Sequence, residues 1–282
     1  MPNATIDGID TYYETFGAGA PILMCAPGGF DATIDKWRTA SAWTGIDALA
    51  ALAAEHTLIL YDRRECGRSG GRLERLSWGS YTRHAKALLD HLKISSAWIM
   101  GGCMGCSVAL AFGAHYPEAT RGLLLHWPVG GYRWKANSRE RFMRHYNFAK
   151  QNSLKGVITR AQGGKSFWMD PEAGPWAIEI ARNTDFAEKF ASQNLERYLG
   201  IVLTSGQTLY DRDTAPGAAP EEVVGIDAAA FIIPGDDPSH ATSGAHYLRE
   251  LLPKADFWNV MPPEQTTQKV CDRLLNFCRL HA

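Results

Sequence analysis

The sequence predicts an α/β fold in which helices cover both faces of a mostly parallel β-sheet, with a helical cap inserted into it. The first observation is a series of short segments that are apolar at every position. Strands of a parallel sheet are buried on both faces, so their residues do not alternate between apolar and polar. The second observation is that segments of helical periodicity separate these strands. The third is the interval 131–225, which is long, helical in pattern and rich in Trp, Arg, Tyr and Phe.

The expected elements follow one another along the chain. Residues 5–16 alternate around Gly8 and predict a hairpin. Buried strands are expected at 21–27, 57–62, 94–100, 123–129, 228–234 and 257–261. Helices are expected at 81–92 and over 267–280. The predicted core domain therefore comprises residues 1–130 and 226–282, and the predicted cap comprises residues 131–225.

The composition is typical of a globular protein and argues against several classes of partner. The chain has 282 residues, 45% of them hydrophobic and 21% charged, with a formal net charge of −1. A charge so close to zero does not predict binding to nucleic acid or to an anionic membrane. No run approaches the roughly 20 apolar residues that cross a bilayer, and the polar start lacks a secretion-signal pattern. The six cysteines are scattered rather than arranged as a disulfide framework, so we expect a cytoplasmic protein.

One cysteine occupies a position with a specific chemical meaning. The apolar run "WIM" leads into Gly101-Gly102-Cys103-Met104-Gly105, and a second apolar run follows. A strand, a G-x-C-x-G turn and a helix together form the nucleophile elbow, which exposes a strained nucleophile at the sheet edge. The N-terminus of the following helix would lower the pKa of the thiol. Two other interpretations stay open: a small buried cysteine, and a redox pair with Cys106. A zinc site is not expected because no second C-x-x-C or nearby histidine pair completes it.

Along nearly its full length the chain resembles the α/β-hydrolase superfamily. The resemblance rests on the order of "APGGF", "YDRRECGRSGG", the elbow, "HYPEATRGLLLHWPVGG" and "FIIPGDD". Most relatives have serine at the elbow. In having cysteine there, this chain resembles dienelactone hydrolase. The resemblance implies an oxyanion hole formed by the backbone N–H of Met104 and by that of Gly29 or Phe30. It implies no cofactor.

The chain departs from the family where the catalytic histidine is expected. Relatives have it after the last strand, but no histidine occurs there between residues 256 and 280. The loop before it, within 232–246, has the family's acid at Asp236 or Asp237, and also His240. We therefore predict Cys103 as nucleophile and His240 as its base. The alternative for His240 is a turn histidine bonded to Asp237 or to the next helix.

Two further residues are candidates for the site. His126 falls near the carboxyl end of a strand, where it would face the pocket or be an ordinary buried histidine. Glu65 replaces a glycine of the family pattern D-x-R-G-x-G-x-S. In dienelactone hydrolase a glutamate holds the resting cysteine protonated, so Glu65 is expected to act similarly or to orient His240. The alternative is an ion pair with Arg64 or Arg68.

These residues predict a cofactor-independent hydrolase. Cys103 would attack a carbonyl carbon and form a thioacyl-enzyme that water then hydrolyses. Activated acyl groups are favoured: esters, lactones and thioesters. His126, Trp127 and Trp134 are expected to bind a small, largely apolar substrate, while Arg133, Arg139 and Arg144 are offered for a substrate carboxylate. Two alternatives are a hydrolase of carbon–carbon bonds in diketones and an inactive small-molecule binder. The expected partner is the small molecule alone, and a homodimer is left open.

Overall fold

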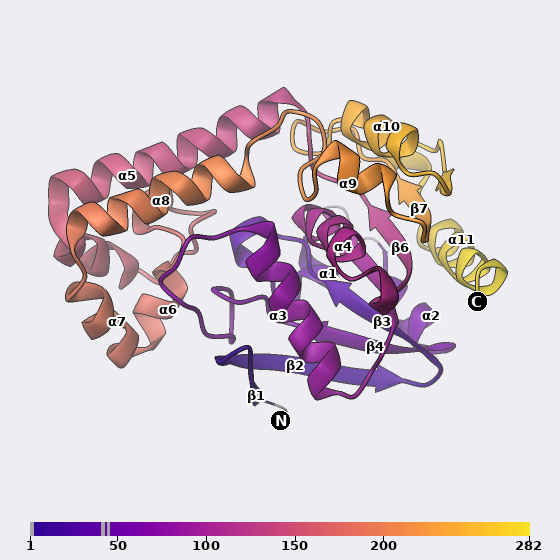
Figure 1. Cartoon of the computed structure of the whole chain (residues 1–282), viewed down its shortest axis with the longest axis horizontal. Coiled ribbons are helices and arrows are strands. Elements are labelled where there is room, and N and C mark those ends of the chain that lie inside the picture. Colours follow the sequence, from indigo (N-terminus) through magenta and orange to yellow (C-terminus); the bar gives the residue numbers. More distant parts are fainter. Residues whose placement is uncertain (1–2, 41–42, 44–45) are drawn as a thin grey trace.

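The computed structural model describes residues 3–40, 43 and 46–282. Within them the strands form a single sheet in the order β1-β2-β4-β3-β5-β6-β7-β8 (Figure 1). β1 pairs with β2, and β2 with β4, in antiparallel register, and every other neighbouring pair is parallel. The strands are β1 (Asn3–Ile6), β2 (Ile9–Gly17), β3 (Ala20–Cys25), β4 (His56–Tyr61), β5 (Ala97–Gly102), β6 (Thr120–His126), β7 (Ala229–Ile233) and β8 (Ala255–Phe257). The predicted hairpin and mostly parallel sheet are confirmed.

Consecutive residues of the central strands enter different hydrophobic cores on the two faces of the sheet. Leu23 and Ile99 belong to one core, while their neighbours Ile22 and Trp98 belong to the other. One core contains side chains of α3 (Trp78–His91), α4 (Met104–His115) and α10 (Thr242–Leu251). The other contains those of α1 (Lys36–Thr39), α2 (Ala48–Ala53) and α11 (Thr267–Leu280). Burial on both faces explains why these strands are apolar throughout.

Two predicted boundaries differ from the structure. The last strand was expected at 257–261, but β8 ends at Phe257 because the N–H of Val260 turns back to the carbonyl of Trp258. The helix expected at 81–92 begins at Trp78, because Ser77 caps it and exchanges hydrogen bonds with Ser80. Such a capping box satisfies free N–H groups of the first turn. The last helix, α11, spans the predicted residues 267–280.

Between β6 and β7 the chain forms a series of helices, and all but the last of them lie to one side of the sheet in Figure 1. They are α5 (Tyr132–Ala161), α6 (Ala177–Arg182), α7 (Thr184–Ala191), α8 (Leu195–Leu209) and α9 (Pro220–Val224), with a short 3₁₀ turn, η3 (Pro171–Ala173), between α5 and α6. Three other 3₁₀ turns lie outside this segment: η1 (Gly29–Asp31), η2 (Pro117–Ala119) and η4 (Pro262–Glu264). α5 runs alongside α8 (Figure 1) and contains a kink at Ser153, where φ is 62°. α9 instead packs against α4 and α10.

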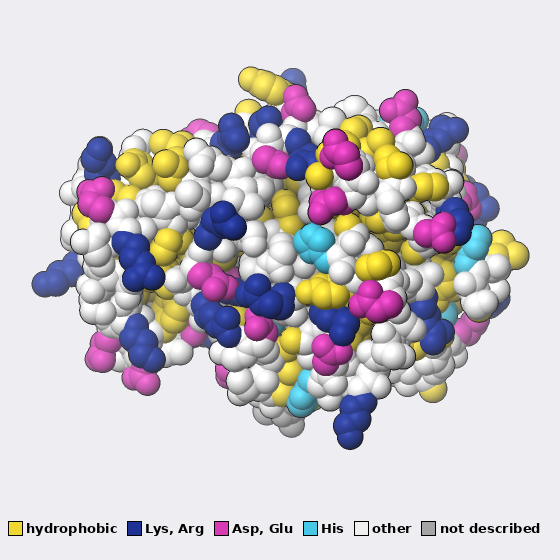
Figure 2. Space-filling view, in the orientation of Figure 1, with side chains coloured by type: hydrophobic (Ala, Val, Ile, Leu, Met, Phe, Trp, Pro, Cys, Tyr) yellow, Lys and Arg dark blue, Asp and Glu magenta, His cyan; other side chains and the backbone are white. Residues whose placement is uncertain are grey.

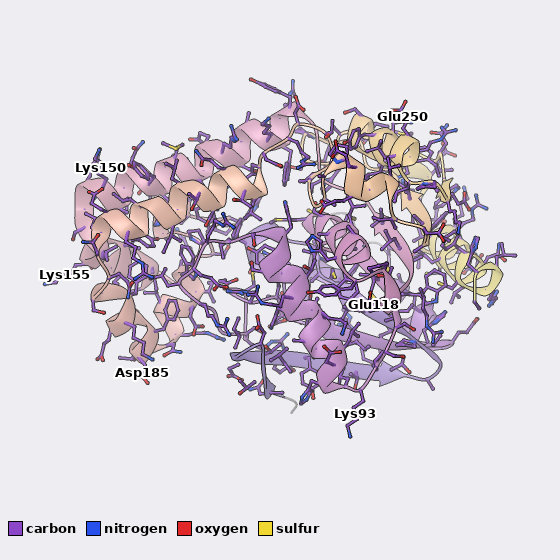
Figure 3. All side chains as sticks on the ribbon, in the orientation of Figure 1. Lys93, Glu118, Lys150, Lys155, Asp185 and Glu250 are labelled. Carbon is purple, nitrogen blue, oxygen red and sulfur yellow. The ribbon has the colours of Figure 1, made fainter. Side chains whose placement is uncertain are left out.

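Charges of both signs are mixed on the face of the molecule that Figure 2 shows, and the formal net charge of the chain is −1. In Figure 2 acidic and basic side chains are interspersed over the visible face. The labelled Lys93, Lys150, Lys155 and Asp185 project outward from the periphery in Figure 3. Among the described residues, no helix has the length and apolar character needed to cross a membrane.

Candidate active site

Cys103 lies at the turn between β5 and α4. Its backbone has φ 53° and ψ −125°, a conformation that side chains rarely adopt. The flanking glycines are required by close packing: a β-carbon on Gly101 would lie 2.5 Å from the backbone nitrogen of Cys106, and one on Gly105 would overlap the carbonyl oxygen of Cys25. The structure therefore has the strand–turn–helix geometry that the sequence predicted around Cys103.

The environment of Cys103 differs from that of the other thiols. Burial raises the pKa of Cys103, but His240 and the backbone N–H groups of Gly28 and Met104 outweigh it and lower the pKa below its ordinary value. The other cysteines are all buried and free, and burial raises the pKa of each: Cys25, Cys66, Cys106, Cys271 and Cys278. Thiolate character is therefore favoured at Cys103 alone among the six.

His240 is delivered to Cys103 by the loop that follows β7. Residues Gly130 and His240 form a parallel bridge, and the N–H of Gly130 donates to the carbonyl of Ser239 at 3.1 Å. These contacts fix the loop to the chain that leaves β6. His240 is 6% exposed, and its Nε2 has no hydrogen-bond partner among the described residues. Burial lowers the pKa of His240, but Asp237 and Cys103 together raise it well above the ordinary value.

The structure distinguishes the two candidate acids. Asp237 Oδ2 accepts a hydrogen bond from His240 Nδ1 at 2.7 Å, and Oδ1 accepts from the backbone N–H groups of Ser239 and His240 at 2.7 and 3.0 Å. These bonds close a tight turn that holds the carboxylate and the ring together, and they lower the pKa of Asp237 to about 2. Asp236 is exposed and does not line the cavity described below. Of the two candidate acids that the sequence left open, Asp237 is therefore the one that bonds the imidazole.

A second group of residues supports His240 from behind. The Trp127 ring contacts the His240 ring edge to face, with centroids 5.5 Å apart, and its Nε1 donates to Gln265 Oε1 at 2.6 Å. Gln265 is buried and donates from Nε2 to the carbonyls of Pro234 and Val260, each at 2.7 Å. Gln265 lies in the segment after β8 in which relatives have their histidine. Sequence reasoning missed it, because a glutamine in a loop has no signal of its own.

A cavity of about 480 Å³ opens above Cys103. Its lining includes the aromatic side chains of Phe30, Trp43, Trp134, Trp168 and Tyr210 and the polar side chains of Cys103, Asp237 and His240. Gly28, Gly29 and Met104 also line it. The predicted contact of Trp134 with this space is therefore present. Among the described residues, no group of three or more His, Cys, Asp or Glu side chains is arranged to hold a metal ion.

The turn after β3 is fixed by a buried arginine. Arg63 Nη2 donates to the carbonyl of Gly29 at 2.5 Å. Because C=O and N–H point in opposite directions across a trans peptide, this bond turns the N–H of Phe30 away from Arg63. Gly29, Phe30 and Met104, from which the resemblance implies an oxyanion hole, all line the cavity. The backbone N–H of Gly28 also helps to lower the pKa of Cys103, and the sequence did not predict this role.

Two of the predicted substrate-binding residues lie outside the cavity. His126 is fully buried, with its ring against that of Trp43 at 5.0 Å between centroids, and burial lowers its pKa to about 3. Its backbone carbonyl, rather than its ring, serves the elbow by accepting the N–H of Cys103 at 3.2 Å. Trp127 is directed toward Gln265 and His240, as described above. Strand-end position predicted the proximity of both residues to the site but not the direction of their side chains.

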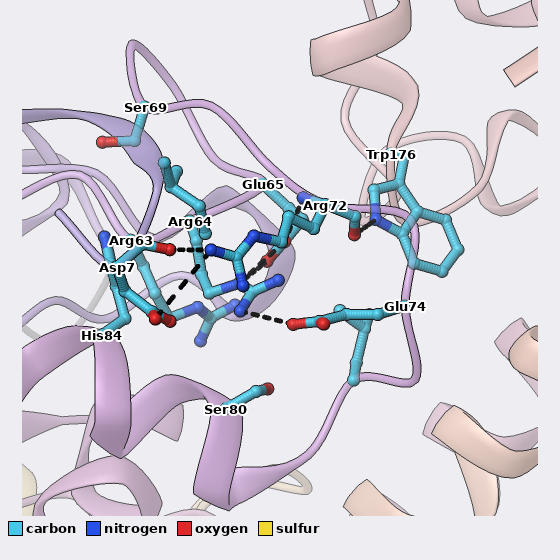
Figure 4. Close-up of polar contacts among 12 residues, drawn as sticks. Asp7, Arg63, Arg64, Glu65, Ser69, Arg72, Glu74, Ser80, His84 and Trp176 are labelled. Carbon is cyan, nitrogen blue, oxygen red and sulfur yellow. Dashed lines mark hydrogen bonds and ion pairs between the residues drawn. The ribbon is translucent and has the colours of Figure 1, made fainter. Parts of the chain in front are cut away.

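Glu65 is held in an ion-pair network away from the cavity (Figure 4). Both of its carboxylate oxygens accept from Arg64 Nε, at 2.9 and 3.1 Å, and Oε1 also accepts from the N–H of Arg72 at 3.3 Å. Arg64 reaches Glu74 on its other side at 2.8 Å. The carbonyl of Arg72 accepts from Trp176 Nε1 at 2.8 Å, which ties the network to the helical segment. The predicted catalytic role of Glu65 is not supported; the alternative ion pair with Arg64 is what forms.

Replacing Glu65 tests this correction. Glu65 and Arg64 are 1% and 0% exposed, and removing one partner of a buried pair costs about 3 kcal/mol because the other charge stays buried. Glu65→Ala is expected to lower the free energy of unfolding by about that amount in urea denaturation. The rate at which iodoacetamide alkylates Cys103 should stay within about twofold of wild type. Faster alkylation in the folded variant would instead show that Glu65 restrains the thiol.

Comparison with known proteins identifies the family. The model of the "alpha/beta hydrolase fold" family matches residues 21–178, which is more than half of the chain. A protein of Azorhizobium caulinodans described as "Putative carbamate hydrolase RutD" is 34% identical over 125 residues, which make up 44% of this chain and 43% of that protein. The chain thus matches less than half the length of this curated relative.

Solved structures share the whole fold at low identity. The meta-cleavage product hydrolase CumD of Pseudomonas fluorescens has a TM-score of 0.62 and 17% identity, covering 100% of this chain and 98% of that one. The enol-lactonase of Burkholderia xenovorans has a TM-score of 0.57 and 17% identity, covering 99% and 97%. With its sheet order, its elbow and the family match over residues 21–178, the chain belongs to the alpha/beta hydrolase fold family.

Proposed function

We propose that the protein is a cofactor-independent hydrolase of activated acyl bonds with Cys103 as its nucleophile. The observation that carries this proposal is that Cys103, His240 and Asp237 line the same cavity, with the Asp237 carboxylate bonded to the imidazole. The thiol has a lowered pKa, the imidazole a raised pKa, and the carboxylate is bonded to the far ring nitrogen. This is the arrangement of a nucleophile, its base and the group that orients the base.

The chemistry follows from these roles. The Cys103 thiolate attacks the carbonyl carbon, and the electron pair of the carbonyl double bond moves onto oxygen. N–H groups of the turn after β3 and of Met104 would stabilise this oxyanion. The tetrahedral intermediate collapses, the carbon–oxygen bond to the leaving group breaks, and the imidazolium of His240 donates a proton to that group. His240 then accepts a proton from water, which attacks the thioester and releases the acid and the thiolate.

The cavity supports a small substrate with an activated acyl group. A thiolate is a better leaving group than an amine, so attack on an amide tends to revert, whereas esters, lactones and thioesters go forward. A volume of about 480 Å³ with aromatic walls suits a compact, largely apolar molecule. Trp134, Trp168 and Tyr210 supply much of this wall. We therefore also propose that residues 131–225 act as a cap over a core of residues 1–130 and 226–282.

A trapping experiment tests the proposed function. The purified protein is mixed with p-nitrophenyl acetate, quenched in acid within milliseconds to seconds, and its mass is measured. A gain of one acetyl group, mapped to Cys103 and lost with time as p-nitrophenol accumulates, is the expected result. Turnover of a diketone without a covalent intermediate would favour the carbon–carbon hydrolase. Saturable thermal stabilisation by substrate-like ligands without any turnover would favour the binder.

A further inference from the structure

The basic side chains at the cavity are not equally neutralised. Lys36, Arg141 and His240 line it. Lys36 Nζ lies 2.7 Å from Asp31 Oδ2, and His240 Nδ1 lies 2.7 Å from Asp237 Oδ2. Among the described residues, no carboxylate forms an ion pair with Arg141. Its sequence neighbour Glu140 lies 3.8 Å from the guanidinium of Arg144 instead.

Arg141 is fixed in place without being neutralised. Its Nη1 donates to the main-chain carbonyls of Phe167 and Trp168, at 3.3 and 2.6 Å. The guanidinium lies over the Trp168 ring, 4.4 Å from its centroid. Its Nε is buried and has no partner among the described residues. Burial lowers the pKa of Arg141, as expected for a cation that has lost water without gaining an anion.

Two hydroxyl groups line the cavity together with Arg141. Ser138 is one helical turn before it on α5, so the two residues share a face, and both line the cavity with Tyr210. Burial raises the pKa of Tyr210, and Arg63, Ser138 and Arg141 oppose that effect. Arg63 is buried and does not itself line the cavity. This part of the lining therefore combines the positive charge of Arg141 with two hydroxyl groups that can donate hydrogen bonds.

We propose that Arg141, with Ser138 and Tyr210, binds a carboxylate of the substrate, so that the cavity takes acyl compounds carrying a second, ionised acid group. A guanidinium matches a carboxylate through two parallel N–H···O bonds, and its Nε and Nη2 are not used by the protein's own hydrogen bonds. This proposal rests on the proposed hydrolase function of the same cavity. It replaces the residues that the sequence offered for this role: Arg133, Arg139 and Arg144 are all exposed and do not line the cavity.

A matched pair of substrates tests the proposal. The acid is the mono-4-nitrophenyl ester of adipic acid, and the neutral control is the same compound with its free carboxyl methylated. Wild type is expected to prefer the acid by about 10- to 100-fold in kcat/KM, mainly through KM, because a hydrogen-bonded charge has this effect. Arg141→Gln should remove most of the preference, and Arg141→Lys should restore part of it.

Two features keep this test independent of stability. Any loss of activity caused by movement of the Trp168 segment lowers kcat/KM for both substrates, so the ratio of the two values is not affected by it. The control variant is Arg144→Gln, on the same helix but exposed, which should leave the ratio unchanged. A wild-type ratio near one, or a ratio that survives in Arg141→Gln, would overturn the carboxylate site.

A second measurement separates this proposal from the hydrolase itself. Adipate and its neutral diamide are added to the wild-type protein and the melting temperature is recorded. If adipate but not the diamide raises the melting temperature saturably, and Arg141→Gln loses this effect, the carboxylate site is supported. This holds even if neither ester is hydrolysed, and in that case only the hydrolase proposal fails. Hydrolysis of both esters at equal rates, with no stabilisation by adipate, would leave the hydrolase standing and remove the carboxylate site.

Discussion

The Cys103→Ala variant is expected to lose ester hydrolysis by about 10⁴- to 10⁶-fold, which would reduce it to the background rate. Cys103 is the one cysteine among the described residues that lines the cavity, so no other thiol can replace it. The measurement is kcat/KM for a p-nitrophenyl ester, with circular dichroism to check folding. Cys106→Ala is the matched control, because the Cys106 thiol donates to backbone carbonyls beneath the elbow and is buried. Retention of a tenth of the activity by Cys103→Ala would rule out Cys103 as the nucleophile.

Alkylation reports the same thiol without any assumption about substrate. Iodoacetamide near neutral pH is expected to modify Cys103 and leave the buried cysteines unmodified. Because the pKa of Cys103 is lowered, its thiolate persists at pH values below the pKa of a free thiol, which is roughly 8.5. The alkylation rate should therefore fall only when the pH drops through the lowered pKa of Cys103. His240→Ala should move the midpoint upward, because burial then acts on the thiol without the opposing imidazolium. An unchanged midpoint would remove His240 from the site.

The second large effect is expected at Asp237. Asp237→Asn should lower kcat by about 10²- to 10⁴-fold, because the imidazole loses the anion that orients it and stabilises its protonated form. The pKa of Asp237 is about 2, so the carboxylate is ionised throughout the working range and acid losses of activity come from Cys103. The midpoint of Cys103 alkylation should also rise in this variant, since a less basic His240 stabilises the thiolate less.

Asp236→Asn is the matched control for this experiment. The two residues are adjacent and chemically identical, but only Asp237 bonds the imidazole, while Asp236 is exposed. Asp236→Asn should therefore stay within about twofold of wild type in kcat and in the alkylation midpoint. Equal losses in the two variants would show that charge in the loop, rather than the bond to His240, is what matters.

The differences between prediction and structure at the candidate site share one feature: they concern side-chain direction. Glu65 was expected to border the elbow, but the guanidinium of Arg64 holds its carboxylate in a separate network, and its backbone has a φ of 65°. His126 ends a strand beside Cys103, yet its ring is covered by Trp43. Arg141 is one of several arginines on α5, and only the packing of Trp168 shows that it faces the cavity.

The sequence by itself determined the sheet with helices on both faces, the elbow at Cys103 and the loop that brings His240. These depend on local chemistry: apolar strands, glycines where a β-carbon would collide, and turn residues at short spacing. Only the tertiary structure showed that Asp237 rather than Asp236 bonds His240, brought Gln265 to Trp127, and left Arg141 without an ion pair among the residues that the structure describes. These three features depend either on contacts between residues distant in the chain or on the direction of one side chain within a loop. Such contacts and directions leave no periodic signal in the sequence.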